Sequence, residues 1–308
     1  MKLHDALDTR PAHRMLARQI WTALRGLGLD HGWVTCIGMD AATFTGHITP
    51  QEYGDAGSYA EWTGPIRPAG DVYDAVLMPQ LDTDPPPDAI IANLPYANLH
   101  MRSPRSAKSV DTVHEELLTD TTGHIAPGGF LVALTSRQLM DGEHTGVRQT
   151  LAQAMDLVGA LRLPGTVYHP ALSTGQTAPT DLLVLRRRQP GEPNGSAVWA
   201  ASGPVVFPGG QARVNSYFTN HYPHYVLGEV GFIDDPDGDS RRIAVLPSST
   251  PLEPAVRLGL AQIVHQARAN GLTARPLAAG PEPAPPGGGE IARTHRRLGR
   301  GPSAVVGG

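Results

Sequence analysis

The chain has only one cysteine, Cys36, among its 308 residues. One cysteine forms no disulfide within the chain and provides no cysteine-rich zinc site. It lies in an expected strand, where a thiol behaves as an inert core residue. A signal peptide and an apolar run long enough to span a membrane are also lacking. We therefore expect a cytoplasmic protein without a membrane partner.

An excess of positive charge is lacking too, because the formal net charge at pH 7 is −4. This excludes a globally basic DNA-binding protein but leaves room for a local basic patch. The sequence has neither a phosphate-binding loop with Gly-Lys-Ser/Thr nor a nucleophile elbow. His221 and His224 have no carboxylate or cysteine partner at a suitable spacing, so we expect no metal site.

Apolar residues make up 40% of the chain, which suffices for one sizeable domain with extensions. Expected strands and helices alternate, which favours an α/β fold with a mainly parallel sheet. An apolar face predicts a helix near the N-terminus, formed by Leu16, Ile20, Leu24 and Leu27. Two more helices are expected around Val110–Leu118 and Val147–Met155. The expected strands lie within residues 33–44, 89–92, 126–136, 156–164 and 180–187.

Three segments depart from this alternating pattern. Residues 51–87 are rich in Gly, Pro and Asp, and we expect an insertion there. Residues 191–275 form a C-terminal extension after the domain of residues 1–190. From Pro276 the chain becomes rich in Pro, Gly, Ala and Arg, a composition that supports no packed core, so residues 276–308 are expected to be a disordered tail.

The most informative feature is the tetrapeptide Asn93-Leu94-Pro95-Tyr96, which follows the buried run of residues 89–92. The Asn93 side-chain oxygen and the Leu94 carbonyl can both accept hydrogen bonds from an NH₂ group. Pro95 keeps Leu94 out of the helical region, and Tyr96 offers a ring for stacking. These residues suit the holding of a planar group that carries an amino nitrogen. The alternative is an ordinary turn after a strand, where Asn and Pro are common.

The tetrapeptide resembles the Asn/Asp-Pro-Pro-Tyr/Phe catalytic motif of amino-group methyltransferases, above all the DNA adenine-N6 methylases. Protein-glutamine methyltransferases share this motif, and Leu94 departs from it where the family has a proline. Further segments, in the family's order, resemble the strands and the segment that follow the motif in large helicase–methylase proteins: Ala126–Ser136, Asp156–Pro164, Thr180–Arg187, Val214–Phe218 and Val226–Glu229.

The resemblance implies a Rossmann-like class I methyltransferase sheet and S-adenosylmethionine as the cofactor. It assigns Asn93, Leu94, Pro95 and Tyr96 as catalytic residues. Asp40, after the strand of residues 33–38, corresponds to the aspartate that binds the cofactor adenine; the alternative is a turn aspartate.

Other candidate residues lie on either side of these positions. Asp8 is a candidate for the acidic residue that holds the ribose, and its alternative is a charge at a helix terminus. Arg102, Arg105 and Lys108 are candidate nucleic-acid-binding residues that would hold phosphates beside an extruded base, or else solvated loop charges.

A methyltransferase of this fold needs a glycine-rich turn after its first strand, where the backbone approaches the cofactor. We find no such turn before Asn93, and Gly26-Leu27-Gly28 is expected to close a helix instead. The resemblance therefore implies a chain that lacks the family's first strand and glycine loop. On this ground we expect weak binding of S-adenosylmethionine by the isolated chain.

The sequence thus predicts methyl transfer from S-adenosylmethionine to an exocyclic amino group, adenine N6 of DNA being the preferred acceptor. DNA is the expected partner, and a second chain or an upstream segment could complete the cofactor site. The alternative is a non-catalytic methyltransferase remnant that binds nucleic acid or a partner protein.

Overall fold

The computed structural model describes residues 10–38, 41–44, 66–68, 85–94, 102–103, 106–107, 110–165, 179–234 and 241–274. The chain divides into two units, residues 1–275 and 276–308. The expected tail is the second unit and lies outside the described residues.

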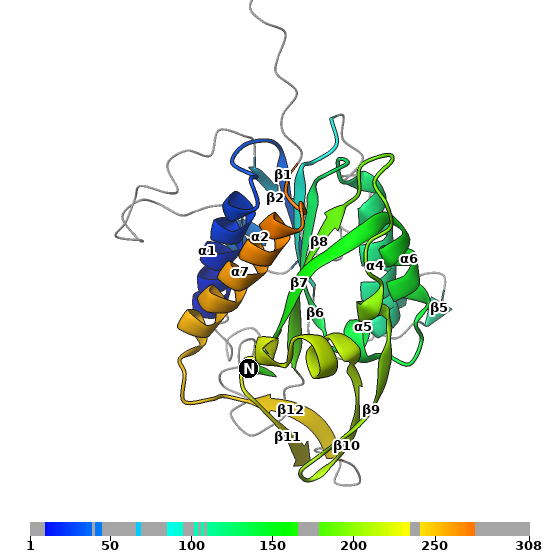
Figure 1. Ribbon diagram of the computed structural model, residues 1–308, viewed down its shortest axis with the longest axis vertical. Helices are drawn as coiled ribbons and strands as arrows, with labels where there is room; N and C mark the ends of the chain where they lie inside the picture. Colours follow the sequence, from blue (N-terminus) through cyan, green and yellow to red (C-terminus); the bar gives the residue numbers. More distant parts are fainter. Residues whose placement is uncertain are drawn as a thin grey trace, which may run out of the picture. The chain divides into compact units, whose positions relative to one another are not determined.

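A six-stranded sheet in the order β2-β1-β3-β6-β8-β7 forms the centre of the first unit (Figure 1). Strands β2, β1, β3 and β6 run parallel, and β8 runs antiparallel to both β6 and β7. The strands are β1 Val34–Gly38, β2 Ile66–Pro68, β3 Ala89–Asn93, β6 Phe130–Ser136, β7 Met155–Leu163 and β8 Thr180–Arg187. The predicted fold class, a Rossmann-like α/β sheet with mainly parallel strands, is confirmed.

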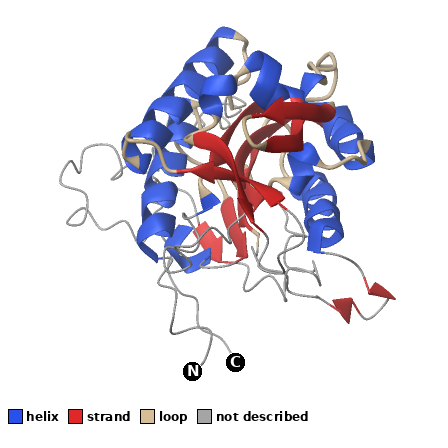
Figure 2. Ribbon diagram, turned by 90° about the horizontal axis from the view of Figure 1, so that it is seen from below, coloured by secondary structure: helices blue, strands red, loops and turns tan. Residues whose placement is uncertain are grey.

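Helices cover both faces of this sheet, which explains why β1, β3 and β6 are mainly apolar (Figures 1 and 2). All residues of β1 and β3 are buried, as expected for parallel strands with both faces covered. One layer holds α1 Arg10–Gly26, α2 Ala41–Phe44 and α7 Leu252–Ala269. The other holds α4 Val110–His124, α5 Gln138–Asp141 and α6 Gly146–Ala154.

Helix α1 follows the prediction from its apolar spacing. Leu16, Ile20, Leu24 and Leu27 are all at most 1% exposed. Gly28 has a φ of +90°. The Gly28 and Leu29 N–H groups bind the Arg25 and Leu24 carbonyls at 2.8 and 3.0 Å. This is a Schellman cap, which confirms that these glycines close a helix.

Two boundaries differ from the expectation. Met155 was expected to end a helix, but it opens β7, where it pairs with Arg187 of β8. Sheet pairing here outweighs the helical spacing of the preceding residues.

Ile66–Pro68 lies in the segment expected to be an insertion, and it adds an edge strand parallel to β1. Two short strands after β3, Arg102–Ser103 (β4) and Ser106–Ala107 (β5), pair with each other.

The C-terminal extension consists of two antiparallel strand pairs followed by a helix. The pairs are Ser202–Phe207 (β9) with Gly210–Asn215 (β10), and Glu229–Asp234 (β11) with Arg241–Leu246 (β12). Single helical turns at Val198–Ala200 (η5), Tyr217–His221 (η6) and Pro223–Tyr225 (η7) connect them to the domain.

Helix α7 then returns to the sheet and packs tightly against β7. A Cβ atom on Gly159 would lie 2.6 Å from Ile263 Cγ1, and one on Gly259 would lie 2.7 Å from Leu161 Cδ2. Glycine on each element therefore permits the close approach. The extension thus contributes a helix to the core of the domain.

Cys36 is fully buried in β1, and burial raises the pKa of its thiol. Because the thiolate is the reactive form, a thiol reagent should label the folded protein at pH 8 at least about a hundredfold more slowly than the unfolded protein. Stopped-flow labelling with a chromogenic disulfide checks this, with Cys36→Ala as the unlabelled control. Labelling of the folded protein at the unfolded rate would contradict the burial of Cys36.

None of the helices that the structure describes is long and apolar enough to cross a membrane.

Candidate active site at the carboxyl edge of the sheet

The order in which the chain adds parallel strands to the sheet changes direction between β1 and β3. From β1 the chain continues to β2 on one side of the sheet, whereas from β3 it continues to β6 on the other side. In open parallel sheets, ligands bind outside the carboxyl ends of the two strands at such a switch point. The residues that end β1 and β3 are therefore the first candidates for a binding site.

These two residues are Gly38 and Asn93, which are direct partners in the pairing of β1 with β3. Gly38 has a φ of +92°, a conformation that favours glycine, and α2 begins three residues later at Ala41. Gly38 is a single glycine rather than the glycine-rich turn of the family, so the absence of that turn stays an expectation.

The backbone around Asn93 is held on both sides. Asn93 lies between Gly38 of β1 and Leu134 of β6 in the sheet. The Leu94 N–H donates to the Leu134 carbonyl at 3.0 Å, so Leu94 continues the pairing beyond the strand. The Asn93 side chain is 0% exposed. A group that binds its carboxamide must therefore enter the fold, where hydrogen bonds are stronger than in water.

The structure places only part of the predicted site. Asn93 and Leu94 lie together at the switch point, and β4 contains the backbone of Arg102. The remaining predicted residues lie outside the described part of the chain: Pro95, Tyr96, Asp40, Asp8, Arg105 and Lys108.

A buried polar pair lies one residue further along β6. Thr135 directly follows Leu134, the partner of Asn93, and its Oγ1 is 3.2 Å from Nδ1 of His114 on α4. Both side chains are buried. Thr135 belongs to the Thr-Ser ending of a predicted strand, whereas His114 could not be predicted, because the pair arises only when α4 packs on β6.

Further along the same edge, Arg162 at the end of β7 binds two carboxylates. Its guanidinium meets Asp181 of β8 with two contacts of 2.8 Å and Asp141 of α5 with two of 2.9 Å. The Phe218 ring lies 4.3 Å from the guanidinium carbon. All three charged side chains are buried.

The charges in this cluster stabilise one another. Burial lowers the pKa of Arg162, but Asp141 and Asp181 outweigh this effect and the pKa lies above its ordinary value. Burial raises the pKa of Asp181, which Arg162 opposes. We take the pair to be ionised, because the two contacts at 2.8 Å have the geometry of a charge-assisted fork.

Asn215 joins the extension to this cluster. Its backbone N–H donates to Asp141 Oδ1 at 2.9 Å, and its side-chain amide donates to the Met140 and Trp199 carbonyls at 2.7 Å. Asn215 belongs to Val214–Phe218, a segment that stands out in the sequence only by its resemblance to the family. Its hydrogen bonds attach the extension to α5.

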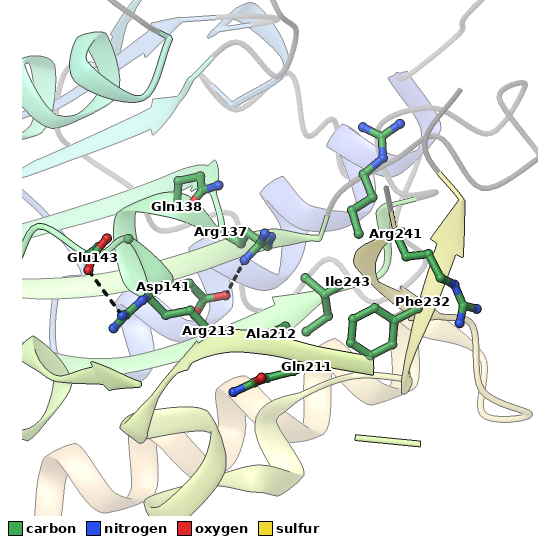
Figure 3. A pocket seen from close by; sticks show the side chains of 12 residues that line it. Arg137, Gln138, Asp141, Glu143, Gln211, Ala212, Arg213, Phe232, Arg241 and Ile243 are labelled. Carbon is green, nitrogen blue, oxygen red and sulfur yellow. Dashed lines mark hydrogen bonds and ion pairs between the residues drawn. The ribbon is translucent and has the colours of Figure 1, made fainter. Parts of the chain in front are cut away.

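A pocket of about 350 Å³ opens next to α5, between the edge of the sheet and the extension (Figure 3). Four arginines line it: Arg137, Arg213, Arg241 and Arg242. Among the described residues, no group of three or more His, Cys, Asp or Glu side chains is placed to hold a metal ion.

No protein-family model matches the sequence, and no curated protein matches it. Several solved structures resemble it weakly. One is a suggested class I S-adenosylmethionine-dependent methyltransferase from Listeria monocytogenes, at 13% identity and a TM-score of 0.38, covering 58% of this chain and 62% of that protein. This chain thus spans about three fifths of that relative.

Two other structures are of the same kind. The N-methyltransferase NodS from Bradyrhizobium japonicum has 15% identity and a TM-score of 0.32 over 58% of this chain and 98% of its own. The M protein of the type I restriction enzyme EcoKI has 12% identity and a TM-score of 0.35 over 86% of this chain and 74% of its own.

Proposed function

We propose that this protein transfers a methyl group from S-adenosylmethionine to an exocyclic amino group, with adenine N6 of DNA as the acceptor. The observation that carries the proposal is the position of Asn93, which ends β3 beside Gly38 at the switch point of the sheet. The amide and carbonyl that can bind an amino group thus stand where open α/β sheets bind ligands.

The residues at the end of β1 fit a cofactor of this kind. Gly38 has no side chain and has a positive φ, so the backbone can approach a ligand closely there. Asp40, two residues further on, is the proposed contact for the cofactor adenine. S-adenosylmethionine would supply the methyl group: the sulfur–methyl bond would break as the amino nitrogen bonds to the methyl carbon, S-adenosylhomocysteine would leave, and the nitrogen would lose one proton to solvent.

The chain's own residues hold and orient the amino group. The Asn93 side-chain oxygen and the Leu94 carbonyl accept hydrogen bonds from its two hydrogens, which directs the nitrogen lone pair to a fixed position. Tyr96 stacks on the base, a contact of about 1–3 kcal/mol that offsets part of the few kcal/mol that base extrusion costs. Arg102, Arg105 and Lys108 are proposed to bind the flanking phosphates.

A second candidate function is a non-catalytic module that binds nucleic acid or a partner chain. The full burial of Asn93 favours this alternative. In that case the asparagine would stabilise the backbone at the end of β3 and would bind no substrate. The two candidates differ in one measurable property, the transfer of a methyl group.

The test is the transfer of a tritiated methyl group from S-adenosylmethionine to a synthetic duplex. The chain is assayed alone and with an upstream segment supplied in cis or in trans. We expect labelling of an adenine-containing duplex and none of a matched duplex in which purine, which lacks the amino group, replaces every adenine. No labelling in any combination would favour the non-catalytic alternative, whereas equal labelling of both duplexes would reject adenine N6 as the acceptor.

A further inference from the structure

We propose that the arginine pocket beside α5 binds phosphate groups of a nucleic-acid backbone. The pocket lies outside the predicted motif, and three of its four arginines come from the C-terminal extension. Four arginines face two carboxylates, Asp141 and Glu143, among the charged residues that line it. Its lining therefore carries an excess of positive charge in a chain whose formal net charge is −4.

Arg213 of β10 is held in place but remains accessible. Its Nη1 donates to the Ser202 carbonyl at 3.0 Å, which fixes the guanidinium. Its Nη2 is 3.6 Å from Glu143, whose side chain is 79% exposed. Exposed ion pairs of this kind contribute little, so a phosphate can replace the carboxylate at small cost.

Arg241 of β12 repeats this arrangement on the second strand pair. Its Nη1 donates to the Gly209 carbonyl at 2.8 Å, and its Nε is 3.3 Å from Asp234, which is 85% exposed. Its guanidinium carbon lies 6.0 Å from the centre of the Phe232 ring, which also lines the pocket (Figure 3). A backbone carbonyl thus orients each arginine, while its carboxylate partner faces solvent.

Arg137 connects the pocket to the candidate active site. It follows β6 directly, three residues after Leu134, the partner of Asn93. Its ion pair with the buried Asp141, at 3.1 Å, makes it part of the structure rather than a free phosphate contact. Arg213 and Arg241 are therefore the proposed phosphate contacts.

The arginine fork matches the geometry of phosphate oxygens, which it can bind with two parallel hydrogen bonds. The choice of nucleic acid as the source of the phosphates rests on the proposed function. Such contacts would position a strand along the edge of the sheet without reading its sequence.

The test measures binding of a fluorescein-labelled 20-base-pair DNA duplex to the full chain by fluorescence anisotropy. Combined Arg213→Ala and Arg241→Ala substitutions should weaken binding about tenfold or more at 200 mM salt. Each phosphate contact adds about 0.9 to the steepness with which log K falls against log salt. Without two contacts, the double variant should therefore lose about ten times less affinity between 50 and 200 mM salt than the unaltered chain does.

Two further variants serve as controls. Arg257→Ala removes an exposed arginine of α7 and should leave both affinity and salt slope unchanged. Replacing Arg213 and Arg241 by lysine retains the charges and should restore most of the affinity. Unchanged binding by the double alanine variant, an equal loss in Arg257→Ala, or no binding by the unaltered chain at 50 mM salt would overturn the proposal.

This outcome is independent of methyl transfer. DNA binding that depends on the two arginines, without any transfer to adenine, would retain the phosphate pocket and reject the proposed function. Methyl transfer with full DNA affinity in the double alanine variant would retain the proposed function and reject the phosphate pocket.

Discussion

Replacing Asn93 by alanine should lower the rate of methyl transfer by at least about a hundredfold and leave the affinity for the DNA duplex nearly unchanged. Removal of one preorganised hydrogen-bonding group from a site of this kind typically costs 10²–10³ in rate. Asn93 acts on the reacting amino group, so its loss should fall on kcat rather than on KM. Steady-state kinetics with the labelled cofactor, together with anisotropy for DNA affinity, measure both quantities.

Two matched variants separate chemistry from folding. Asn93→Asp keeps a side-chain oxygen as acceptor and corresponds to the other residue of the family motif, so it should retain measurable transfer. Leu94→Pro restores the usual rigid turn and should be neutral or faster. If Asn93→Ala retained full activity, the catalytic assignment would be wrong and the tetrapeptide would be only a turn.

Replacing Arg162 by methionine should lower the free energy of unfolding by about 3–5 kcal/mol, because it leaves Asp141 and Asp181 buried without their cation. For a domain of this size, this corresponds to a fall of roughly 10 °C in Tm. Urea unfolding followed by circular dichroism measures the change.

The controls for this prediction use the same measurement. Arg241→Ala breaks an exposed ion pair with Asp234 and should change the free energy of unfolding by less than about 1 kcal/mol. Adding Asp141→Asn and Asp181→Asn to Arg162→Met should recover part of the loss, because the unpaired charges are then removed as well. A loss below 1 kcal/mol in Arg162→Met would show that the buried cluster does not hold the edge of the sheet.

The parts of the fold that depend on local sequence could be predicted. The apolar face of α1 and the buried runs of β3, β6 and β8 follow from periodicity and burial alone. Strand β2 could not be predicted, because Ile66-Arg67-Pro68 has no apolar run and is a strand only through its pairing with β1. Met155 was misplaced for a similar reason, since pairing with β8 decides its conformation.

The candidate site shows the same division. Asn93 and Leu94 are proposed because one short segment carries both acceptors, and the structure places Asn93 last in β3 with Leu94 directly after it. Gly38 lies in an expected strand, but its positive φ and its pairing with Asn93 depend on the folded sheet and could not be predicted. The arginine pocket was missed because Arg213 and Arg241 lie on different strand pairs, which meet the edge of the sheet only in the folded chain.

The identity of the methylated product shows whether the chain methylates adenine N6 and whether Asn93 takes part. After incubation of the chain, with the upstream segment supplied where needed, with S-adenosylmethionine and the adenine-containing duplex, the DNA is digested to nucleosides and analysed by mass spectrometry. We expect N6-methyldeoxyadenosine with the unaltered chain, formed at least about a hundredfold more slowly with Asn93→Ala. A methyl group on another atom, or N6-methyldeoxyadenosine in equal amounts with Asn93→Ala, would contradict this expectation.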